Sequence, residues 1–300
     1  MIDNKYKLDY LGITKFHEAG YTGQDITITS REGTQSTHGF KVAEILSIVA
    51  PDSQKLLHIS YTDNPQTDIY TTSMFSVSDL YIKNYEKAKK LNDRNVFLCC
   101  AVGNYSNEKQ TELSKFSWWN AIGACTLNNN IPQRIYYSSI TPDLDFMSIT
   151  NFKTSKGTFG GTSCATPVFA GMCALVQSFF KINCGRKLTN KELLAFIRDN
   201  LQDLDKEGFD EKTGDGLFVL PDPATIDINK YLIEGDNEME RKNIKLTIGK
   251  KDFSVNGETK VMDVEPFIQN NRTFVPIRFI SEALGYDVVW NNETKEIEIK

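Results

Sequence analysis

Short apolar runs alternate with helix-like stretches along the first two thirds of the chain, and this alternation limits the possible folds more than any other feature. The strand-like runs are residues 25–30, 55–61, 69–75, 96–102 and 120–127, and the helix-like stretches are residues 39–49, 79–91 and 165–180. Strands that alternate with helices form a parallel sheet with helices on both faces. The sequence therefore predicts a three-layer α/β domain.

The composition changes near residue 233. Residues 234–243 (EGDNEMERKN) are almost free of apolar side chains and are typical of a linker. Beyond them, short alternating runs at 244–248, 252–255, 288–290 and 296–299 predict strands, and the apolar spacing of residues 275–284 predicts a helix. We therefore predict a domain over residues 1–232, a linker over 233–243, and a small α+β domain over 244–300.

Charge and hydropathy argue against several kinds of partner. The formal net charge of −5 is spread along the chain, and no basic block predicts binding to nucleic acid or to an anionic membrane. Nowhere do 18 apolar residues run together, so we predict no membrane span.

The six cysteines lie mostly in apolar runs, and none shows a C-x-x-C spacing. We interpret them as buried free thiols rather than as disulfides or metal ligands, which favours a reducing compartment. The first ten residues contain no apolar stretch of the kind found in signal peptides. Both features favour a cytoplasmic location.

Residues 160–175 (GGTSCATPVFAGMCAL) place a serine between a glycine-rich turn and an apolar helix. Glycines let a substrate backbone approach closely, and a helix N-terminus offers free N–H groups to a developing negative charge. The pattern suits a nucleophile at Ser163, although taken alone it suits a helix-capping serine equally well.

Residues 161–171 resemble the nucleophile motif of the subtilisin family of serine peptidases, G-T-S-x-A-T-P-x-x-A-G, at every specified position. This resemblance implies a subtilisin-like fold and a serine endopeptidase with Ser163 as nucleophile. Residues 37–45 (THGFKVAEI) resemble the family's histidine segment, H-G-T-H-V-A-G-I, and imply that His38 is the general base. Lys41 replaces the family's second histidine and Glu44 its glycine, whereas we expect His17 and His58 to be structural.

Two further segments resemble the family's substrate site. Residues 100–104 (CAVGN) are similar to A-A-G-N, which implies that Asn104 donates a hydrogen bond to the oxyanion. Residues 73–76 (SMFS) stand where the family has a substrate-lining strand, usually S-L-G, and without the glycine Phe75 or Ser76 narrows the specificity pocket. The predicted substrate-binding residues are Ser73, Met74, Phe75, Ser76, Gly103 and Gly161.

The acid of the triad is where the sequence departs from the family. Residues 20–32 (GYTGQDITITSRE) resemble the lead-in G-Y-T-G-x-x-V-x-V-A-V-I-D, so Glu32 stands at the aspartate position, after an unusually polar strand. Asp25, at the opposite end of that strand, is a poor substitute. Two interpretations stay open. Glu32 completes the triad, or it is a solvated loop residue and the domain is a pseudoprotease that binds a peptide or protein partner without cutting it.

Residues 244–300 resemble the small domain found at the N-terminus of some copper amine oxidases and as stalk-like repeats on bacterial surface proteins. The matching segments are 255–257 (VNG), 271–280 (NRTFVPIRFI) and 289–291 (VWN). The resemblance implies a module that binds a partner protein or a surface polymer, and it favours a cell-surface or secreted location. It does not imply copper, because the segment contains no histidine or cysteine.

The predicted chemistry requires no cofactor. A Ser-His-acid triad transfers the acyl group with protein groups alone. The acidic segment 210–215 (DEKTGD) is interpreted as a solvated turn, so a structural calcium site is not indicated.

Overall fold

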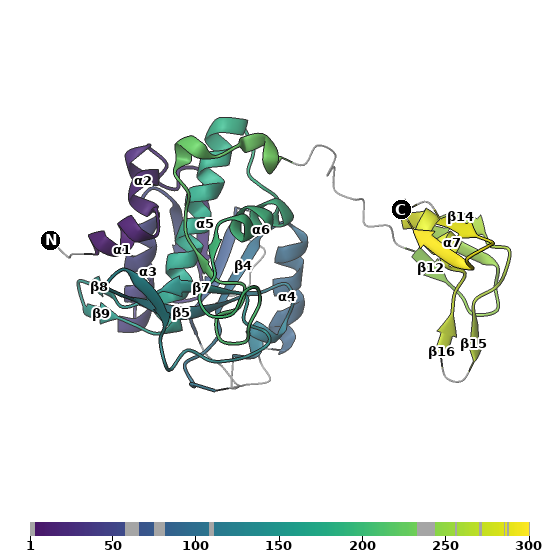
Figure 1. Cartoon of the computed structure of the whole chain (residues 1–300), viewed down its shortest axis with the longest axis horizontal. Coiled ribbons are helices and arrows are strands. Elements are labelled where there is room, and N and C mark those ends of the chain that lie inside the picture. Colours follow the sequence, from purple (N-terminus) through teal and green to yellow (C-terminus); the bar gives the residue numbers. More distant parts are fainter. Residues whose placement is uncertain are drawn as a thin grey trace. The chain divides into compact units, whose positions relative to one another are not determined.

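The structure is a computed structural model that describes residues 4–57, 66–74, 82–107, 111–232, 244–255, 257–269, 272–284, 286 and 288–299, with only the backbone of residues 82–87. The chain forms two compact units, Met1–Ile233 and Glu234–Lys300 (Figure 1). Each unit is described by itself.

A mainly parallel sheet forms the centre of the first unit, and its described part has nine strands in the order β10-β11-β7-β5-β4-β3-β1-β2, with β6 paired to β5. The pairs from β2 to β11 are parallel, whereas β6 and β10 run antiparallel to their neighbours. The strands are β1 Thr27–Ser30, β2 Gln54–Leu57, β3 Ile69–Thr72, β4 Phe97–Ala101, β5 Asn120–Asn128, β6 Ile131–Arg134, β7 Phe146–Ile149, β10 Leu201–Gln202 and β11 Leu217–Phe218.

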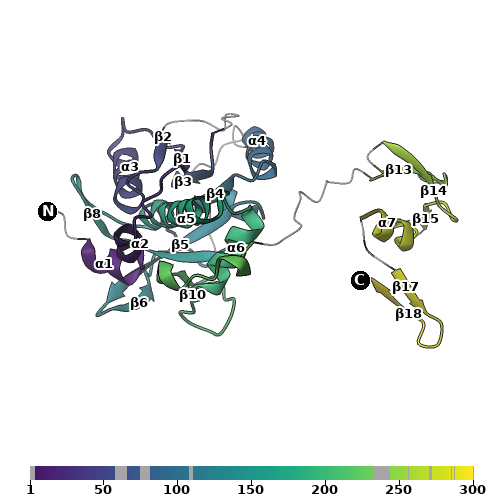
Figure 2. The ribbon, with the colours of Figure 1, turned by 90° about the horizontal axis from the view of Figure 1, so that it is seen from above.

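Helices flank the sheet, as the alternating pattern predicts (Figure 2). The chain passes from β1 through α3 to β2 in one direction along the sheet, and from β3 through α4 to β4 in the other. Because such crossovers are right-handed, α3 and α4 cover opposite faces. The helices are α1 Lys5–Tyr10, α2 Ile13–Glu18, α3 Thr37–Val49, α4 Ile82–Asp93, α5 Thr162–Cys184 and α6 Asn190–Asp199, with 3-10 turns at Glu112–Lys115, Pro223–Thr225 and Ile228–Lys230.

Helix α5 is the core helix of this unit. It packs against α3 and against β3, β4, β5 and β7, and Phe169 on α5 stacks on Phe146 of β7 with ring centroids 5.4 Å apart. In the described part of the chain, α5 is the one helix long and apolar enough to cross a membrane, and 94% of that stretch is buried inside the fold. This burial is that of a core helix.

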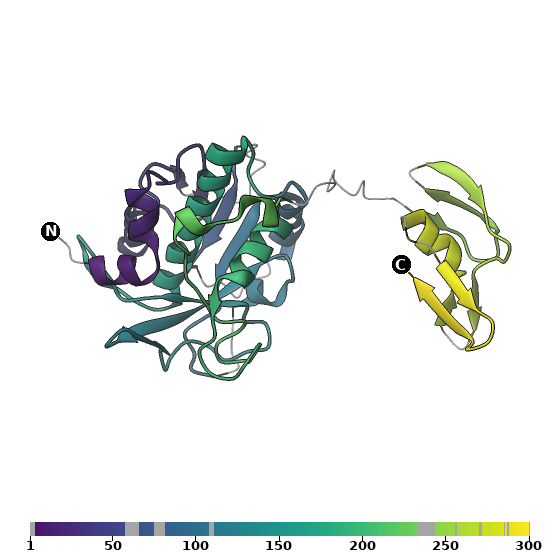
Figure 3. The same ribbon diagram turned by 45° about the horizontal axis from the view of Figure 1, so that its top comes forward.

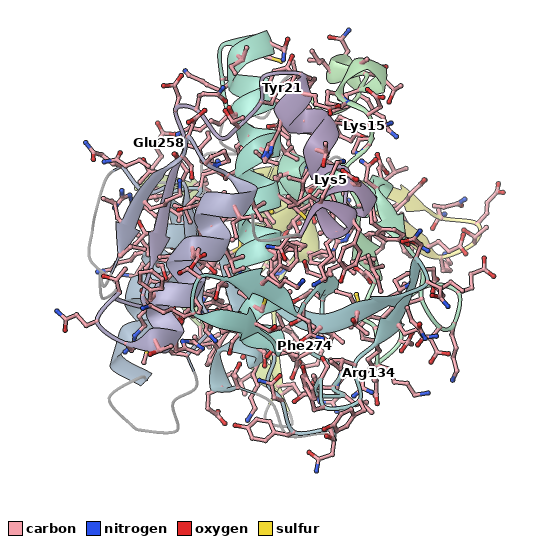
Figure 4. All side chains as sticks on the ribbon, turned by 90° about the vertical axis from the view of Figure 1, so that its left-hand side faces the viewer. Lys5, Lys15, Tyr21, Arg134, Glu258 and Phe274 are labelled. Atoms are coloured by element: carbon pink, nitrogen blue, oxygen red, sulfur yellow. The ribbon has the colours of Figure 1, made fainter. Side chains whose placement is uncertain are left out.

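The N-terminal helices α1 and α2 pack on this core. Phe16 of α2 lies 6.1 Å from the ring of Phe179 on α5, while Lys5 and Lys15 lie on the outer surface (Figure 4). Helix α6 begins at a capping box, in which the side chains of Thr189 and Glu192 each accept the other residue's backbone N–H.

A two-stranded hairpin, β8 Phe152–Thr154 and β9 Gly157–Phe159, stands apart from the main sheet and leads into α5. The sequence did not predict this hairpin or strand β7. The hairpin is short, and β7 carries no strong alternation. Lys41 and Glu44 of α3 hold the hairpin through the carbonyl of Thr158 (3.1 Å) and the N–H and hydroxyl of Ser155 (2.7 and 2.8 Å).

The described part of the second unit contains a three-stranded sheet, two two-stranded hairpins and one helix (Figure 3). Its small core is Phe253, Val255, Met262 and Ala283. The predicted helix and the predicted strands at 252–255, 288–290 and 296–299 are present. The elements are β12 Ile244–Leu246, β13 Asp252–Val255, β14 Glu258–Val261, β15 Phe267–Gln269, β16 Arg272–Phe274, α7 Ile277–Leu284, β17 Val288–Asn291 and β18 Glu296–Ile299.

Candidate active site

The sheet brings the predicted site residues to one edge. Strands β1, β3 and β4 are parallel neighbours, so their carboxyl ends lie side by side. Glu32 follows β1, Ser73 follows β3, and Asn104 follows β4. Ligand sites of open α/β sheets form beyond the carboxyl ends of the strands.

Ser163 is the second residue of α5. Gly161, which precedes the helix, has φ 78° and ψ 179°, a conformation that favours glycine. The residues on either side of Ser163 are buried, whereas Ser163 itself is half-exposed. Its hydroxyl donates a hydrogen bond to the carbonyl of Ser73 (3.3 Å). The structure therefore presents Ser163 at the helix N-terminus with its Oγ turned towards the end of β3.

Asn104 is fixed by the first residue of α5. Its Oδ1 accepts hydrogen bonds from the N–H of Thr162 (3.0 Å) and from the hydroxyl of Thr162 (3.3 Å). Among the described residues, no acceptor pairs with its Nδ2. Both oxygen lone pairs are thus used for positioning, and the N–H groups stay available to another acceptor. The sequence did not indicate that Thr162 plays this part.

A cavity of about 150 Å³ opens beside Ser163 and Asn104. Among the residues that the structure describes, no charged side chain lines it. Gly103, at φ 122°, also borders the cavity, and a Cβ there would lie 2.9 Å from Oγ of Ser139. The lining residues are Ser73, Ala101, Gly103, Asn104, Tyr105, Thr111, Thr162 and Ser163.

The predicted substrate-binding residues are only partly placed by the structure. Ser73 and Gly103 line the cavity, and Gly161 forms the turn before α5. Met74 follows β3, is 40% exposed and does not belong to the cavity lining. Phe75 and Ser76 lie outside the described residues, as does His58.

His38 is the second residue of α3. The hydroxyl of Ser36 caps this helix by accepting the N–H of Gly39 (3.0 Å). The imidazole is half-buried and meets the ring of Phe159 edge-on at 5.4 Å. Phe159 precedes Ser163 by four residues, so the hairpin β8–β9 brings the base to the nucleophile's end of α5. In contrast, Nε2 of His17 is hydrogen-bonded to the carbonyl of Val49 (2.8 Å), which is a structural role.

Glu32 is a buried residue, only 3% exposed, which overturns the interpretation of Glu32 as a solvated loop residue. Its carboxylate accepts hydrogen bonds from the hydroxyl of Ser30 (2.7 Å), the hydroxyl of Thr72 (3.4 Å) and the N–H of Ser73. The polar character of β1 now has a physical reason, since buried polar groups require partners and Ser30 supplies one to Glu32. The polar residues before Glu32 in the sequence were therefore a sign that this carboxylate is buried.

Glu32 also lies next to the start of α3. A Cβ added to Gly39 would lie 3.2 Å from the Cβ of Glu32 and 2.0 Å from the carbonyl oxygen of Gly33. Only glycine therefore fits beside the acid loop at this position. Within the described residues, His38 makes no hydrogen bond to Glu32 or to Ser163. Catalytic hydrogen bonds are often long before substrate binds.

Cys164 follows the nucleophile and is not an alternative to it. It is buried, and this burial raises the pKa of its thiol to about 11. The thiol therefore stays protonated near neutral pH. All six cysteines are free thiols, and five of them are buried, as their apolar surroundings predict.

The residues of the second unit do not fit a copper site. Its sequence has no histidine or cysteine, and in the described part of the whole chain no three His, Cys, Asp or Glu side chains gather around a common point. Segment 210–215 is a turn but is not fully solvated as predicted. Asp210 is buried, and its carboxylate accepts the N–H groups of Lys212 (2.8 Å) and Thr213 (3.1 Å).

Comparisons with known proteins connect this geometry to two families. Residues 19–216 match the Subtilase family, and residues 225–299 match the copper amine oxidase N-terminal domain. The minor extracellular protease Epr of Bacillus subtilis (strain 168) is 28% identical over 181 residues, which cover 58% of this chain and 27% of that relative. The chain therefore spans about a quarter of the length of this curated relative.

Two solved structures share the fold. A lanthipeptide protease matches with a TM-score of 0.59 at 17% identity, over 72% of this chain and 92% of the other. The prenylagaramide maturation protease PagA matches with a TM-score of 0.59 at 18% identity, over 71% and 96%. The family match takes in more than half of the chain and includes Glu32, His38, Asn104 and Ser163. The chain belongs to the subtilase family of serine peptidases.

Proposed function

We propose that this chain is a serine endopeptidase in which Ser163 is the nucleophile, His38 the general base and Glu32 the triad acid. The observation that carries the proposal is the position of Ser73 between acid and nucleophile. Its N–H is donated to the Glu32 carboxylate, and its carbonyl accepts the Ser163 hydroxyl (3.3 Å). One residue at the end of β3 thus holds both ends of the proposed triad.

The electrostatics of Glu32 support this role. A buried carboxylate requires compensation, and three hydrogen-bond donors supply part of it. No lysine or arginine in the described part of the chain forms an ion pair with Glu32. An imidazolium at His38 is the cation that this carboxylate would stabilise when the base takes up the serine proton.

The reaction then follows acyl-transfer chemistry. Ser163 Oγ attacks the peptide carbonyl while His38 takes the proton, and His38 returns that proton to the leaving amine. Nδ2 of Asn104 and the N–H of Ser163 at the helix N-terminus stabilise the oxyanion of the tetrahedral intermediate. One such donor contributes about 3 kcal/mol to the transition state. Water then hydrolyses the acyl-enzyme by the reverse sequence of proton transfers.

The cavity beside Ser163 supports a preference for an uncharged side chain on the acyl side of the cut bond. Its volume of about 150 Å³ suits a group the size of a benzene ring. None of its described lining residues carries a charge that would pair with lysine, arginine, aspartate or glutamate. Digestion of a mixed peptide library, read by mass spectrometry, should give cuts after leucine- or phenylalanine-sized residues. Cuts mainly after charged residues would contradict this specificity.

The test of the proposed function compares wild type with Ser163→Ala and with Cys164→Ala. We expect wild type to cleave unfolded casein, Cys164→Ala to retain cleavage, and Ser163→Ala to lose it at an unchanged melting temperature. No cleavage by folded wild type would favour the pseudoprotease alternative. Cleavage that survives Ser163→Ala would show that another group, or a contaminant, does the chemistry.

A further inference from the structure

Tyr137 is hydrogen-bonded to both loops that carry the proposed oxyanion donors. Its hydroxyl accepts the N–H of Gly161 (3.2 Å), which lies two residues before Ser163. Its main-chain carbonyl accepts the N–H of Ser106 (3.0 Å), which lies two residues after Asn104. One residue from the segment after β6 thus touches the loop after β4 and the turn before α5.

The segment around Tyr137 is itself firmly anchored. Ser138 and Ser139 are fully buried. The N–H of Ser139 donates to the carbonyl of Gly103 (3.0 Å), and the hydroxyl of Ser138 accepts the N–H of Ala124 in β5 (3.1 Å). Arg134, labelled in Figure 4, donates to the carbonyl of Ser138 through Nη2. Tyr137 therefore projects from a part of the chain that is bonded to the sheet.

Tyr137 gives the N–H of the turn before α5 its acceptor, while the hydroxyl of Thr150 donates to the Gly161 carbonyl of the same turn (2.8 Å). Gly161 has no side chain, and its N–H precedes the helix, so no intrahelical carbonyl can accept it. The next residue, Thr162, donates its N–H to Oδ1 of Asn104 (3.0 Å). A Cβ on Gly161 would lie 3.1 Å from Nδ2 of Asn104, so the two loops are in close contact. A displacement of the turn would therefore move both donors.

We propose that Tyr137 is a positioning residue for the oxyanion hole and that its hydroxyl sets the distance between the Asn104 amide and the Ser163 N–H. This inference rests on the proposed function, in which those two groups bind the oxyanion. Donors act when they lie about 2.7–3.1 Å from the site that the oxyanion will occupy. Tyr137 touches neither substrate nor oxyanion in this account. It acts through the two loops.

The neighbouring tyrosine provides a matched control. Tyr136 is 77% exposed, and its ring lies 5.1 Å from that of Tyr137. Tyr137→Phe keeps the ring and removes the acceptor for Gly161, whereas Tyr136→Phe removes a hydroxyl on the surface. We expect Tyr137→Phe to lower kcat by roughly 10-fold with KM within about 2-fold of wild type. Tyr136→Phe should leave both constants unchanged. Melting temperatures check that both variants fold.

A double-mutant cycle with Asn104→Ala distinguishes positioning of the Asn104 amide from a general loss of order in the site. If Tyr137 acts by placing the Asn104 donor, Tyr137→Phe should lower kcat much less in the Asn104→Ala background than in wild type. A peptide boronic acid, which forms a tetrahedral adduct with the serine, should bind Tyr137→Phe about 10-fold more weakly while KM is unchanged.

The outcomes distinguish this inference from the proposed function. Two results would overturn the positioning role. One is a folded Tyr137→Phe variant with the kcat of wild type. The other is a fall in kcat on Tyr137→Phe that is as large in the Asn104→Ala background as in wild type. If Asn104→Ala still lowers kcat in that case, the oxyanion assignment stands without Tyr137. If neither wild type nor Tyr136→Phe hydrolyses the peptide, both the proposed function and the positioning role are wrong.

Discussion

The two halves of the proposed site are built differently. In the nucleophile half, Ser163 and Asn104 follow the family motif, and Thr162 ties them together. In the acid–base half, the acid is one methylene longer than in the family, and the residues around His38 differ from it. Glu32 is nevertheless the more deeply buried residue and accepts three hydrogen bonds, whereas Asn104 is exposed. Departure from a motif does not imply a disordered site.

The two halves also differ in how completely their residues are joined by hydrogen bonds. In the nucleophile half, Oδ1 of Asn104 is bonded to Thr162, and its Nδ2 has no acceptor among the described residues and is available to a ligand. In the acid–base half, the carboxylate is fixed, but His38 forms no hydrogen bond with Glu32 or Ser163 among the described residues. The imidazole of His38 contacts the ring of Phe159, and the two ring centroids lie 5.4 Å apart. We expect substrate binding to close the remaining gap between base, acid and nucleophile.

The largest effect is expected from neutralising the acid. Glu32→Gln keeps the size of the side chain and removes the charge that stabilises the imidazolium, so kcat/KM should fall by about 10³-fold or more. Glu32→Asp keeps the charge and should retain far more activity than Glu32→Gln. Steady-state hydrolysis of a fluorogenic peptide measures both. Equal activity of Glu32→Gln and wild type would show that the acid–base half works without this carboxylate.

A somewhat smaller loss is expected in the nucleophile half. Asn104→Ala removes one oxyanion donor, so kcat should fall by about 10²-fold with little change in KM. The same fluorogenic assay separates the two constants. A rise in KM with unchanged kcat would instead place Asn104 among the groups that bind the ground state.

A third change breaks the acid–base half without touching an ionisable group. Gly39→Ala places a Cβ 2.0 Å from the carbonyl oxygen of Gly33, so the loop that carries Glu32 must move. We expect a loss of about 1–3 kcal/mol in stability and a fall in kcat of roughly 10-fold. Gly20→Ala is a control for lost stability alone, because its φ of 87° disfavours alanine although no atom lies within 4 Å of its Cβ position, and it should leave kcat unchanged. Chemical denaturation and kinetics on both variants provide the comparison, and normal kinetics in a folded Gly39→Ala would contradict it.

The smallest effect on activity is expected at Asp145, which lies outside both halves. Burial raises the pKa of its carboxyl group to about 6. The folded protein therefore binds this proton more tightly than the unfolded chain does. The resulting stability is present below pH 3.8 and is lost as the pH rises through about 6. Ionisation of Asp145 at neutral pH thus costs about 3 kcal/mol.

Asp145→Asn should remove this cost while an amide oxygen still accepts the N–H of Ala121, a bond of 2.7 Å in the structure. We expect a higher melting temperature at pH 7.5, no gain at pH 4, and unchanged kcat/KM. Thermal unfolding at the two pH values is the measurement. A gain of equal size at both pH values would show that the charge of Asp145 is not the cause.

The sequence predicted the parts of this molecule in which local pattern decides structure. The parallel sheet and helix α7 both follow from the hydrophobic pattern of the sequence. The family motif placed Ser163 on a helix N-terminus. In each case the determining residues are close in the chain.

The remaining features depend on contacts between distant segments, which no local pattern contains. Glu32 accepts hydrogen bonds from Thr72, the last residue of β3, and from Ser73, which follows it. The polar residues of β1 indicate such a buried group only when this distant partner is known. The contact of His38 with Phe159 depends on the hairpin β8–β9, which Lys41 and Glu44 hold. Tyr137 belongs to no sequence motif, and its role is indicated only by its hydrogen bonds to Gly161 and Ser106.

The two halves form one working site only if Glu32 acts as the acid of the triad. Labelling with a fluorophosphonate probe tests it most directly, because the probe reports the reactivity of the serine without a choice of substrate. Wild type, Ser163→Ala, Glu32→Gln and the exposed control Glu112→Gln would be compared at equal folded concentration. We expect rapid labelling of wild type and Glu112→Gln, labelling slowed by about 10²-fold or more in Glu32→Gln, and none in Ser163→Ala. Labelling of Glu32→Gln at the wild-type rate, or no labelling of folded wild type, would contradict it.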